Sequence, residues 1–318
     1  MGKAISRRGF LCTTIGGALA AGLATREAAE GAANTLPRRV LGKTGVRVPI
    51  LAMGTAPAGT GAADKDAIAL FHEAIDQGVN YMDTAPDFAG YGRAQTQLGH
   101  VLKERRKEVF LVTKTFTPDG DKARALLERN LKELQTDHAD LVYVHSLGAD
   151  EMDPKQSLGP SGTLRALLKA REEGLTRFVG ISGHNRPQRF VEALQEHDID
   201  VMMNAVNFVD RHTYDFETKV WPVAAKKNIG LVAMKVYGGQ RGQGCAMPKE
   251  HVPMAFRYAL SLPNVATAVI GMQTKAELQQ NLAWARAFKP LTDEERAKLE
   301  KIGREIAQQW GAHFGAVV

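Results

Sequence analysis

The sequence predicts an α/β fold, a (β/α)8 TIM barrel with an N-terminal β-hairpin and an extra C-terminal helix. Eight short apolar runs alternate with amphipathic segments along the 318 residues, which matches the element count and size of such a barrel. In addition, Asp83, Lys114 and His145 recur at intervals of 31 residues, each at the end of a β-branched run. Because one βα unit takes about 30 residues, we expect these side chains at the same end of consecutive strands.

The elements follow in order. Two short strands around a Gly42–Gly45 turn are typical of a β-hairpin. The expected barrel strands are residues 49–55, 80–85, 109–115, 140–146, 177–182, 201–207, 230–236 and 265–271. Helical periodicity covers residues 66–78, 94–106, 121–135, 163–174, 187–197, 214–228, 253–262 and 276–288, and a last amphipathic segment at 291–311 is expected to pack across the outside.

The alternative to a barrel is a doubly wound open sheet. That fold usually carries a glycine-rich G-x-G-x-x-G turn after its first strand. The corresponding segment here, MGTAPAGTG at residues 53–61, lacks this spacing. Near-continuous apolar strands separated by helices also require a parallel sheet covered on both faces. The barrel is therefore the favoured fold.

The first 33 residues are expected to form a twin-arginine export signal rather than part of the barrel. Residues 6–11 read SRRGFL, residues 12–24 are uncharged and rich in Ala and Gly, and small residues at 29–33 offer cleavage sites. An apolar stretch of about 13 residues is too short for a membrane span, which needs about 20, and it fits a signal peptide. We expect recognition of residues 6–11 by the twin-arginine translocase, a periplasmic or otherwise exported product without a stable membrane span, and one domain over residues 34–318.

Charge and cysteine content exclude two classes of function. The net charge of +6 falls to +4 without residues 1–33, which hold four basic and two acidic residues. The remaining basic residues alternate with acidic ones, which is typical of a solvated surface and argues against nucleic-acid binding. Only Cys245 would remain after cleavage, and the nine histidines show no HxH or HExxH spacing. We therefore expect neither an intrachain disulfide nor a metal site.

Short motifs recur in a fixed order on the expected strands. They are Gly54-Thr55, Asp83-Thr84-Ala85-Pro86, Val112-Thr113-Lys114, His145, Gly180-Ile181-Ser182, and Glu277-Leu278 with Asn281. Taken together, from about Arg38 to Asn281, the chain resembles the aldo-keto reductase family. The resemblance implies hydride transfer between a nicotinamide cofactor, NADP or NAD, and a small-molecule aldehyde or ketone, or the corresponding alcohol.

The resemblance also implies roles for individual residues. Asp83 would pair with Lys114, whose ammonium would lower the pKa of a catalytic tyrosine, and His145 would orient the carbonyl. This is chemically sound because a phenol of pKa near 10 is a poor acid at neutral pH. Cofactor contacts are implied for Gly54, Thr55, Ser182, Asn204, Met234, Lys235, Gly271, Met272, Lys275, Gln280 and Asn281.

Two interpretations of the proton donor are open. The family places its tyrosine five positions after the aspartate, where this chain has Phe88, which carries no exchangeable proton. The loop is one residue longer than the usual pattern, and Tyr91 follows shortly. In the first interpretation Tyr91 brings its hydroxyl into the site. In the second, Phe88 occupies the slot, and the proton comes from Lys114, His145 or water, or is not needed.

The residues expected to contact the nicotinamide also differ from those of the family. The family binds the carboxamide with a Ser-Asn pair, and this chain has only the serine, Ser182. The usual Gln of the sixth barrel strand aligns with Met203, which leaves Asn204 as an amide partner. The aromatic residue that stacks on the nicotinamide aligns with Met234, whose thioether covers a ring face less rigidly.

A different part of the sequence is expected to contact the cofactor phosphate. The arginine that often binds the 2′-phosphate of NADP aligns with Glu277, whose carboxylate would repel it, and Lys275 is the nearby cation available to compensate. NADP is expected from the family, and NAD stays open. Outside the cytoplasm no pool of NAD(P)H is expected, so a cofactor would be loaded before export and recycled on the protein by a second substrate.

Two further hypotheses belong to other functional classes. Phe88 favours a non-catalytic nucleotide-binding or redox-sensing barrel that has lost its acid. Met203, Met234 and Glu277 favour a barrel that binds no nicotinamide. Cofactor titration distinguishes the last hypothesis from the other two, and carbonyl-dependent turnover distinguishes an enzyme from a sensor.

Overall fold

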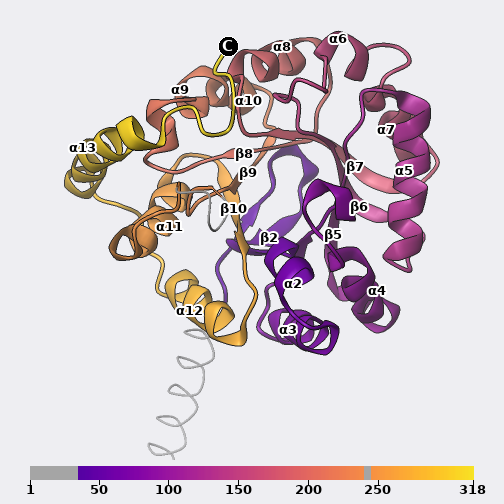
Figure 1. The fold of residues 1–318 in the computed structure, drawn as a ribbon, viewed down its shortest axis with the longest axis horizontal. Helices are drawn as coiled ribbons and strands as arrows, with labels where there is room; N and C mark the ends of the chain where they lie inside the picture. Colours follow the sequence, from indigo (N-terminus) through magenta and orange to yellow (C-terminus); the bar gives the residue numbers. More distant parts are fainter. Residues whose placement is uncertain (1–34, 240–244) are drawn as a thin grey trace, which may run out of the picture. The chain divides into compact units, whose positions relative to one another are not determined.

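The computed structural model describes residues 35–239 and 245–318, so the predicted signal lies outside the described residues. The predicted barrel is confirmed: eight parallel strands close in the order β10-β3-β4-β5-β6-β7-β8-β9 (Figure 1). The strands are β3 (Leu51–Gly54), β4 (Tyr81–Asp83), β5 (Phe110–Thr115), β6 (Ala139–His145), β7 (Thr176–Gly183), β8 (Val201–Ala205), β9 (Gly230–Met234) and β10 (Val265–Gly271).

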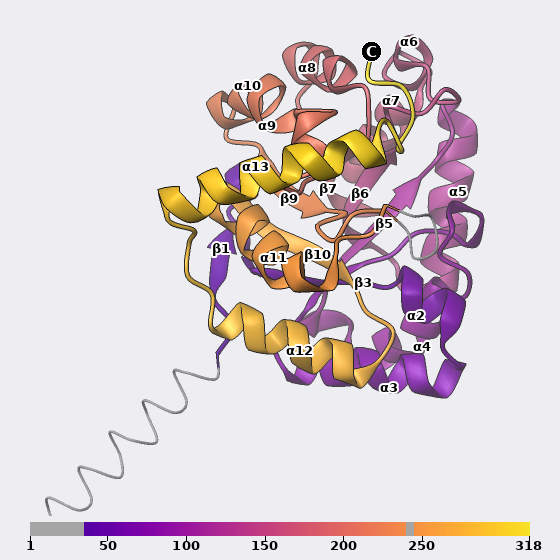
Figure 2. The same ribbon diagram turned by 60° about the vertical axis from the view of Figure 1, so that its left-hand side comes forward.

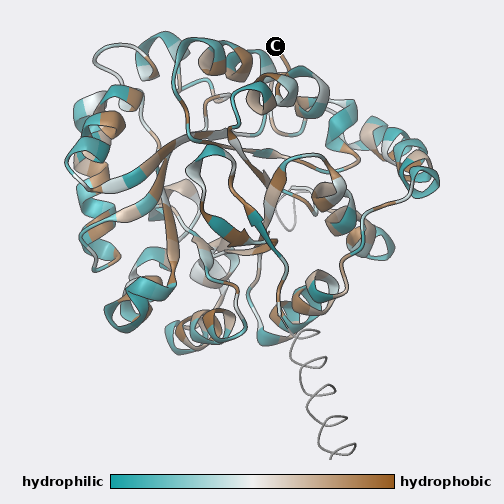
Figure 3. Cartoon of the chain, turned by 180° about the vertical axis from the view of Figure 1, so that it is seen from behind, coloured by the Kyte–Doolittle hydropathy of each residue, from teal (hydrophilic) through white to brown (hydrophobic). Residues whose placement is uncertain are grey.

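Helices surround this barrel, with hydrophobic residues toward the strands and hydrophilic residues toward solvent (Figure 3). They are α2 (Ala56–Gly61), α3 (Asp64–Asp76), α4 (Ala94–Arg105), α5 (Gly120–Glu133), α6 (Pro154–Ser157), α7 (Thr163–Glu172), α8 (Pro187–Glu196), α9 (Phe216–Lys219), α10 (Trp221–Lys226), α11 (Val252–Ser261), α12 (Lys275–Arg286) and α13 (Asp293–Trp310). Within residues 35–239 and 245–318, none of the helices is both long and apolar enough to cross a bilayer.

The predicted hairpin is confirmed and closes the amino-terminal end of the barrel. Strands β1 (Arg38–Val40) and β2 (Arg47–Pro49) pair antiparallel around a 3-10 turn, η1 (Gly42–Thr44). Leu41 and Val48 are buried in the same apolar cluster as the side chains that fill the barrel interior. Gly42 lies so close to β9 that a Cβ would come within 2.3 Å of the Gly230 amide nitrogen.

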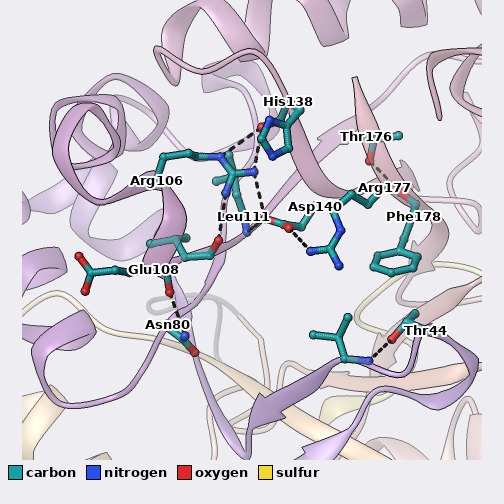
Figure 4. Close-up of polar contacts among 12 residues, drawn as sticks. Thr44, Asn80, Arg106, Glu108, Leu111, His138, Asp140, Thr176, Arg177 and Phe178 are labelled. Carbon is teal, nitrogen blue, oxygen red and sulfur yellow. Dashed lines mark hydrogen bonds and ion pairs between the residues drawn. The ribbon is translucent and has the colours of Figure 1, made fainter. Parts of the chain in front are cut away.

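A buried carboxylate ties the strands together at this same end. Asp140, 4% exposed, accepts from the Leu111 amide at 2.8 Å, from Arg177 at 2.7 Å and from Arg106 at 3.0 Å (Figure 4). Arg106 also donates to the carbonyls of Val109 and His138. Because the carboxylate has donors from the chain around it, its burial is compensated, and this end of the barrel is linked by polar contacts as well as by packing.

The prediction of one helix over residues 214–228 is wrong. The chain forms two short helices, α9 and α10, separated at Val220. Pro222 lies in the first turn of α10, and its ring cannot donate the backbone hydrogen bond that a continuous helix would need there. Proline is tolerated only in a first turn, so a new helix has to begin at this point.

The predicted C-terminal helix is confirmed as α13, which runs across the outside of the barrel (Figure 2). It begins with a capping box, in which Thr292 and Glu295 satisfy each other's backbone amides. Midway along it, Gly303 packs so closely that a Cβ would lie 2.0 Å from the Phe208 carbonyl oxygen. This close approach brings the end of the chain back to the carboxyl-terminal end of the barrel.

Candidate active site

The three residues at 31-residue intervals lie together at the carboxyl-terminal end of the barrel, as expected. Asp83 ends β4, Lys114 is the last but one residue of β5, and His145 ends β6. These strands are consecutive neighbours in the barrel, and their parallel pairing aligns their ends. This mouth is where barrels of this class place their reacting groups.

Asp83 and Lys114 form an ion pair that is almost completely removed from solvent. The Lys114 ammonium donates to Asp83 Oδ2 at 2.7 Å and to the Thr84 carbonyl at 2.9 Å, and the two charged side chains are 2% and 1% exposed. Burial lowers the pKa of Lys114, and the adjacent Asp83 carboxylate opposes that shift. Removing one partner would leave an unpaired buried charge, which costs about 3–5 kcal/mol.

The hydroxyl of Tyr91 completes this cluster. It donates to Asp83 Oδ2 at 3.1 Å and accepts from the Lys114 ammonium at 3.0 Å. Phe88, at the position where the family has tyrosine, lies in the short turn η2 (Asp87–Ala89) and is 54% exposed. The longer loop therefore brings Tyr91, and not Phe88, onto the ion pair.

Glycines give the loop the shape that this placement needs. Gly90 and Gly92 flank Tyr91 with φ of 82° and 53°, a left-handed conformation that glycine adopts without a Cβ penalty. On the facing helix α2, a Cβ on Gly59 would come within 2.2 Å of the Tyr91 carbonyl oxygen. The backbone of Tyr91 can thus lie directly on α2, which directs its side chain inward.

The electrostatics of Tyr91 differ from what the family resemblance implies. Burial, and then the charge and hydrogen bond of Asp83, raise the pKa of Tyr91 well above its ordinary value. The expectation was a pKa lowered by Lys114. In the absence of ligand, the carboxylate that accepts the phenolic proton stabilises the neutral phenol. The hydroxyl of Tyr91 is therefore held protonated, in the state that can donate.

His145 faces the same mouth from β6. Its Nδ1 lies 2.8 Å from Ser182 Oγ, so Nε2 is the nitrogen left for a ligand. Burial, followed by the charge of Lys114, lowers the pKa of His145 well below its ordinary value. The imidazole is therefore neutral at pH 7 and acts as a hydrogen-bonding group rather than as a cation.

Two rings pack against His145. Phe116 lies 5.9 Å and His184 5.8 Å from it between ring centroids, both edge-on. The ring of Phe314, from the segment after α13, lies 5.2 Å from that of His184. The imidazole of His145 thus packs against Phe116 and His184, and Phe314 extends this group of rings.

The segment after α13 also reaches the mouth, a position that the sequence did not predict. The Phe314 amide donates to the Tyr214 hydroxyl at 2.7 Å, and that hydroxyl donates to the Gly315 carbonyl at 3.2 Å. His313 Nε2 lies 2.8 Å from the buried Asp210 carboxylate. These contacts anchor the segment to the chain after β8, and no spacing or motif in the sequence relates the two regions.

Several of the residues expected to contact a cofactor lie at the mouth. Asn204, at the end of β8, is 1% exposed, and its Oδ1 has no hydrogen-bond partner within the described part of the chain. Met234 ends β9 and is 7% exposed, and Lys235 follows it half-buried. Ser182 is also at the mouth, but its hydroxyl is engaged by His145.

The first and last barrel strands meet at the same rim. Gly54 pairs with Gly271, and a Cβ on Gly54 would lie 3.2 Å from the Gly271 amide nitrogen. Thr55 donates its hydroxyl to the Asp83 carbonyl at 3.0 Å, which supports the backbone that carries the ion pair. Met272, in contrast, is completely buried in the core between strands and helices, so its side chain is not presented at the rim.

The expected contacts on α12 are used largely within the protein. Lys275 pairs with Glu73 at 2.8 Å. Asn281 accepts from the Tyr237 hydroxyl at 2.5 Å and donates to a helix carbonyl. Gln280 is exposed to solvent. The structure therefore brings together the residues on the strand ends, whereas Lys275 and Asn281 on α12 bind other parts of the protein.

Comparison with known proteins agrees with this geometry. The family model for the aldo/keto reductase family matches residues 50–244. L-galactose dehydrogenase of Arabidopsis thaliana is 25% identical over 284 residues, covering 77% of this chain and 86% of that protein. Pyridoxal 4-dehydrogenase of Microbacterium luteolum is 26% identical over 320 residues, covering 78% and 92%. A solved structure from Pseudomonas aeruginosa, described as an aldo-keto reductase, superposes with a TM-score of 0.66 at 31% identity, covering 80% of this chain and 97% of that one. The chain belongs to the aldo/keto reductase family.

Proposed function

We propose that this protein, an NAD(P)-dependent oxidoreductase of carbonyl compounds or the corresponding alcohols, moves the proton of its reaction through the Tyr91 hydroxyl. The observation that carries the proposal is the cluster in which this hydroxyl contacts both Asp83 and Lys114. Phe88, in place of the family's tyrosine, was the reason to consider a non-catalytic sensor. Because the Tyr91 hydroxyl contacts the ion pair, Phe88 no longer argues against catalysis.

Each group in the cluster has a chemical task. When bound, the nicotinamide supplies or accepts the hydride at the substrate carbon. In the direction of reduction, Tyr91 gives its hydroxyl proton to the carbonyl oxygen, and the phenolate left behind is stabilised by the Lys114 ammonium. Asp83 keeps Lys114 charged although both side chains are almost completely buried. Neutral His145 hydrogen-bonds the same oxygen and aligns it with the phenol.

The mouth is suited to a nicotinamide cofactor. The buried Asn204 Oδ1 lacks a hydrogen-bond donor among the described residues, and a buried acceptor without a partner is costly. A carboxamide N–H would satisfy it, so we propose that Asn204 holds the carboxamide. Met234, beside it at the end of β9, is positioned to cover a ring face.

Discrimination between NADP and NAD is proposed to be weak. The 2′-phosphate would need a cation, and Lys275 already pairs with Glu73. Glu277 completes the capping box of α12 with Thr274, so its carboxylate is fixed at the helix start. NADP remains the family expectation, and these contacts support use of NAD as well.

Residues 6–11 are proposed to direct export through the twin-arginine translocase. The support is the order of the SRRGFL motif, the uncharged stretch and the small residues that follow. Because NAD(P)H is not expected outside the cytoplasm, the proposal includes a cofactor that is loaded before export, held tightly and recycled by a second substrate.

We expect Tyr91→Phe to lower kcat for carbonyl reduction by about 10²–10⁴-fold, the usual contribution of a general acid, with NAD(P)H binding retained. Phe88→Ala is the control and should keep wild-type kcat, because that side chain points into solvent. Steady-state oxidation of NAD(P)H at 340 nm measures both. Full activity of Tyr91→Phe, or loss of activity in Phe88→Ala alone, would support the second interpretation of the loop instead.

Fluorescence titration of the purified protein with NADPH and NADH should give dissociation constants within about tenfold of each other. An exposed ion pair contributes about 0–1 kcal/mol, and tenfold in affinity corresponds to about 1.4 kcal/mol. Lys275→Met should change neither constant by more than this. A strong preference for NADPH that this substitution removes would contradict the proposal, and failure of both nucleotides to bind would favour the barrel without nicotinamide.

If residues 6–11 direct export, the location of the protein should depend on these residues, and the exported protein should carry a bound nucleotide. Replacing Arg7 and Arg8 together by Lys should remove the protein from the periplasmic fraction, with the cytoplasmic fraction of the same cells as the matched comparison. Protein recovered from the periplasm should release a nicotinamide nucleotide on denaturation, detected by its absorbance after chromatography. An unchanged location would refute the signal, and periplasmic protein without nucleotide would refute loading before export.

A further inference from the structure

A buried polar network lies behind the ion pair, between β5 and the helices α4 and α5 (Figure 1). It consists of Gln95 on α4, Thr113 on β5 and Asn130 on α5, whose side chains are 1%, 0% and 0% exposed. Val112 packs inside the barrel, and side chains alternate between the two faces of a strand. Thr113 therefore points outward to the helices, and Lys114 points inward.

Every hydrogen-bond donor of these three side chains has a partner. The Thr113 hydroxyl donates to Gln95 Oε1 at 2.7 Å. Gln95 Nε2 donates to Asn130 Oδ1 at 3.1 Å and to Glu133 Oε2 at 2.9 Å. Asn130 Nδ2 donates to Thr113 Oγ1 at 3.2 Å and to the Lys114 carbonyl at 2.9 Å. A buried network that is satisfied in this way holds its members in one arrangement.

The polar network reaches both residues of the proposed proton transfer. The bond from Asn130 fixes the backbone of Lys114 itself. Gln95 lies in the first turn of α4, four residues after Tyr91, and the Ala94 amide donates to the Tyr91 carbonyl at 3.1 Å. The strand end that carries the ammonium and the turn that carries the phenol are therefore connected through two side chains.

Helix α5 also contacts the chain on the other side of Tyr91. Arg129 donates to Asp87 Oδ1 at 2.9 Å and to Glu133 Oε1 at 2.8 Å, and Asp87 begins η2, ahead of Tyr91. This ion pair is about half exposed, at 48% and 56%, and exposed pairs contribute little to stability. The buried polar network is accordingly the main restraint, and the ion pair adds to it.

The rate of proton transfer depends on where the phenol lies. A general acid has to be within hydrogen-bond reach of its partner, and a misplacement of about 1 Å caused by a distant substitution can lower a rate about 10²-fold. The loop here is one residue longer than the family pattern. Spacing along the loop therefore does not by itself place Tyr91, and contacts with the neighbouring elements have to do so.

We propose that Gln95 and Asn130 are positioning residues, which hold the Tyr91 hydroxyl against the Lys114 ammonium and so set the rate of proton transfer. They act through the backbone of β5 and of the turn before α4, from the side of β5 that faces the helices. The inference rests on the proposed function, because it assigns further residues to the same proton transfer.

The first test is Asn130→Leu in the full-length protein, which removes the donors to Thr113 and to the Lys114 carbonyl at similar volume. It should lower kcat for carbonyl reduction about 10- to 100-fold and leave the dissociation constants of NADPH and NADH unchanged. In a Tyr91→Phe background it should cost no further activity, because the group that it positions is absent. Asp140→Asn, at the opposite end of β5, is the matched control and should lower the melting temperature but keep kcat.

A triple variant keeps the proposal testable if Asn130→Leu fails to fold. Gln95→Met, Thr113→Val and Asn130→Leu together replace the polar network by apolar groups of similar shape, a change that can be nearly neutral for stability. Circular dichroism should show a melting temperature near that of wild type. The loss in kcat should be the same as for Asn130→Leu, since the restraint on Tyr91 is again absent.

The placement of Tyr91 is measured without reference to activity by 13C NMR of protein labelled at tyrosine Cζ, whose chemical shift responds to the hydrogen bonds of the phenol. The chain has six tyrosines, and Tyr91→Phe identifies the signal. The signal should move in Asn130→Leu, or in the triple variant, and stay in place in Asp140→Asn.

Two sets of results separate this proposal from the proposed function. If Tyr91→Phe loses activity, the positioning role is overturned by an unmoved signal, by wild-type kcat in folded Asn130→Leu, or by an equal loss in the Tyr91→Phe background. If Tyr91→Phe keeps full activity, the proposed function fails and the NMR signal decides alone. A moved signal then supports the role of the polar network in placing Tyr91, and an unmoved one refutes it.

Discussion

A lysine side chain with 1% of its surface exposed keeps its charge only if an anion lies beside it, and the Asp83 carboxylate is that anion. Most of the mouth is arranged around this pair. Thr55 and Thr84 contact its backbone or its ammonium, and Tyr91 contacts both charges. The pair is an energetic constraint as well as a catalytic one, because neither residue can be lost without leaving a buried charge. It also explains why the resting phenol is held protonated: the carboxylate that neutralises the lysine accepts the phenolic proton too.

The amino-terminal end of the barrel contributes mainly to stability, and the carboxyl-terminal end holds the reacting groups. At the amino-terminal end, the buried Asp140 carboxylate accepts hydrogen bonds from Leu111 and Arg177. The hairpin packs against β9 so closely there that Gly42 has no room for a side chain. At the carboxyl-terminal end, Asp83 Oδ1, Thr84 Oγ1 and Asn204 Oδ1 are buried and have no hydrogen-bond partner in the described part of the chain. Unsatisfied buried polar groups are rare in folded proteins. A ligand bound at this rim could supply partners for these three atoms.

Much of the fold was predictable from the sequence because each strand and helix has its own periodicity, and the spacing of Asp83, Lys114 and His145 reports the length of a βα unit. The short helices α2 and α6 were not predicted, and the division into α9 and α10 depended on Pro222, which interrupts a segment whose apolar pattern continues. The site was less predictable. Whether Tyr91 reaches the ion pair depends on left-handed glycines and on the approach of α2, neither of which a residue count reveals. Phe314 meets His184 only because α13 crosses the barrel, a long-range contact without a local signal.

The central claim is that Lys114 acts on the reaction through Tyr91, as one unit with it. A double-mutant cycle on kcat/KM for one aldehyde tests this directly, with Lys114→Met, Tyr91→Phe and the double variant, each checked for a folded barrel by circular dichroism. Groups that act as one unit show strongly non-additive losses, so the double variant should be about as active as the slower single variant. If the two losses in log(kcat/KM) add in the double variant, Lys114 and Tyr91 act independently and the account is contradicted.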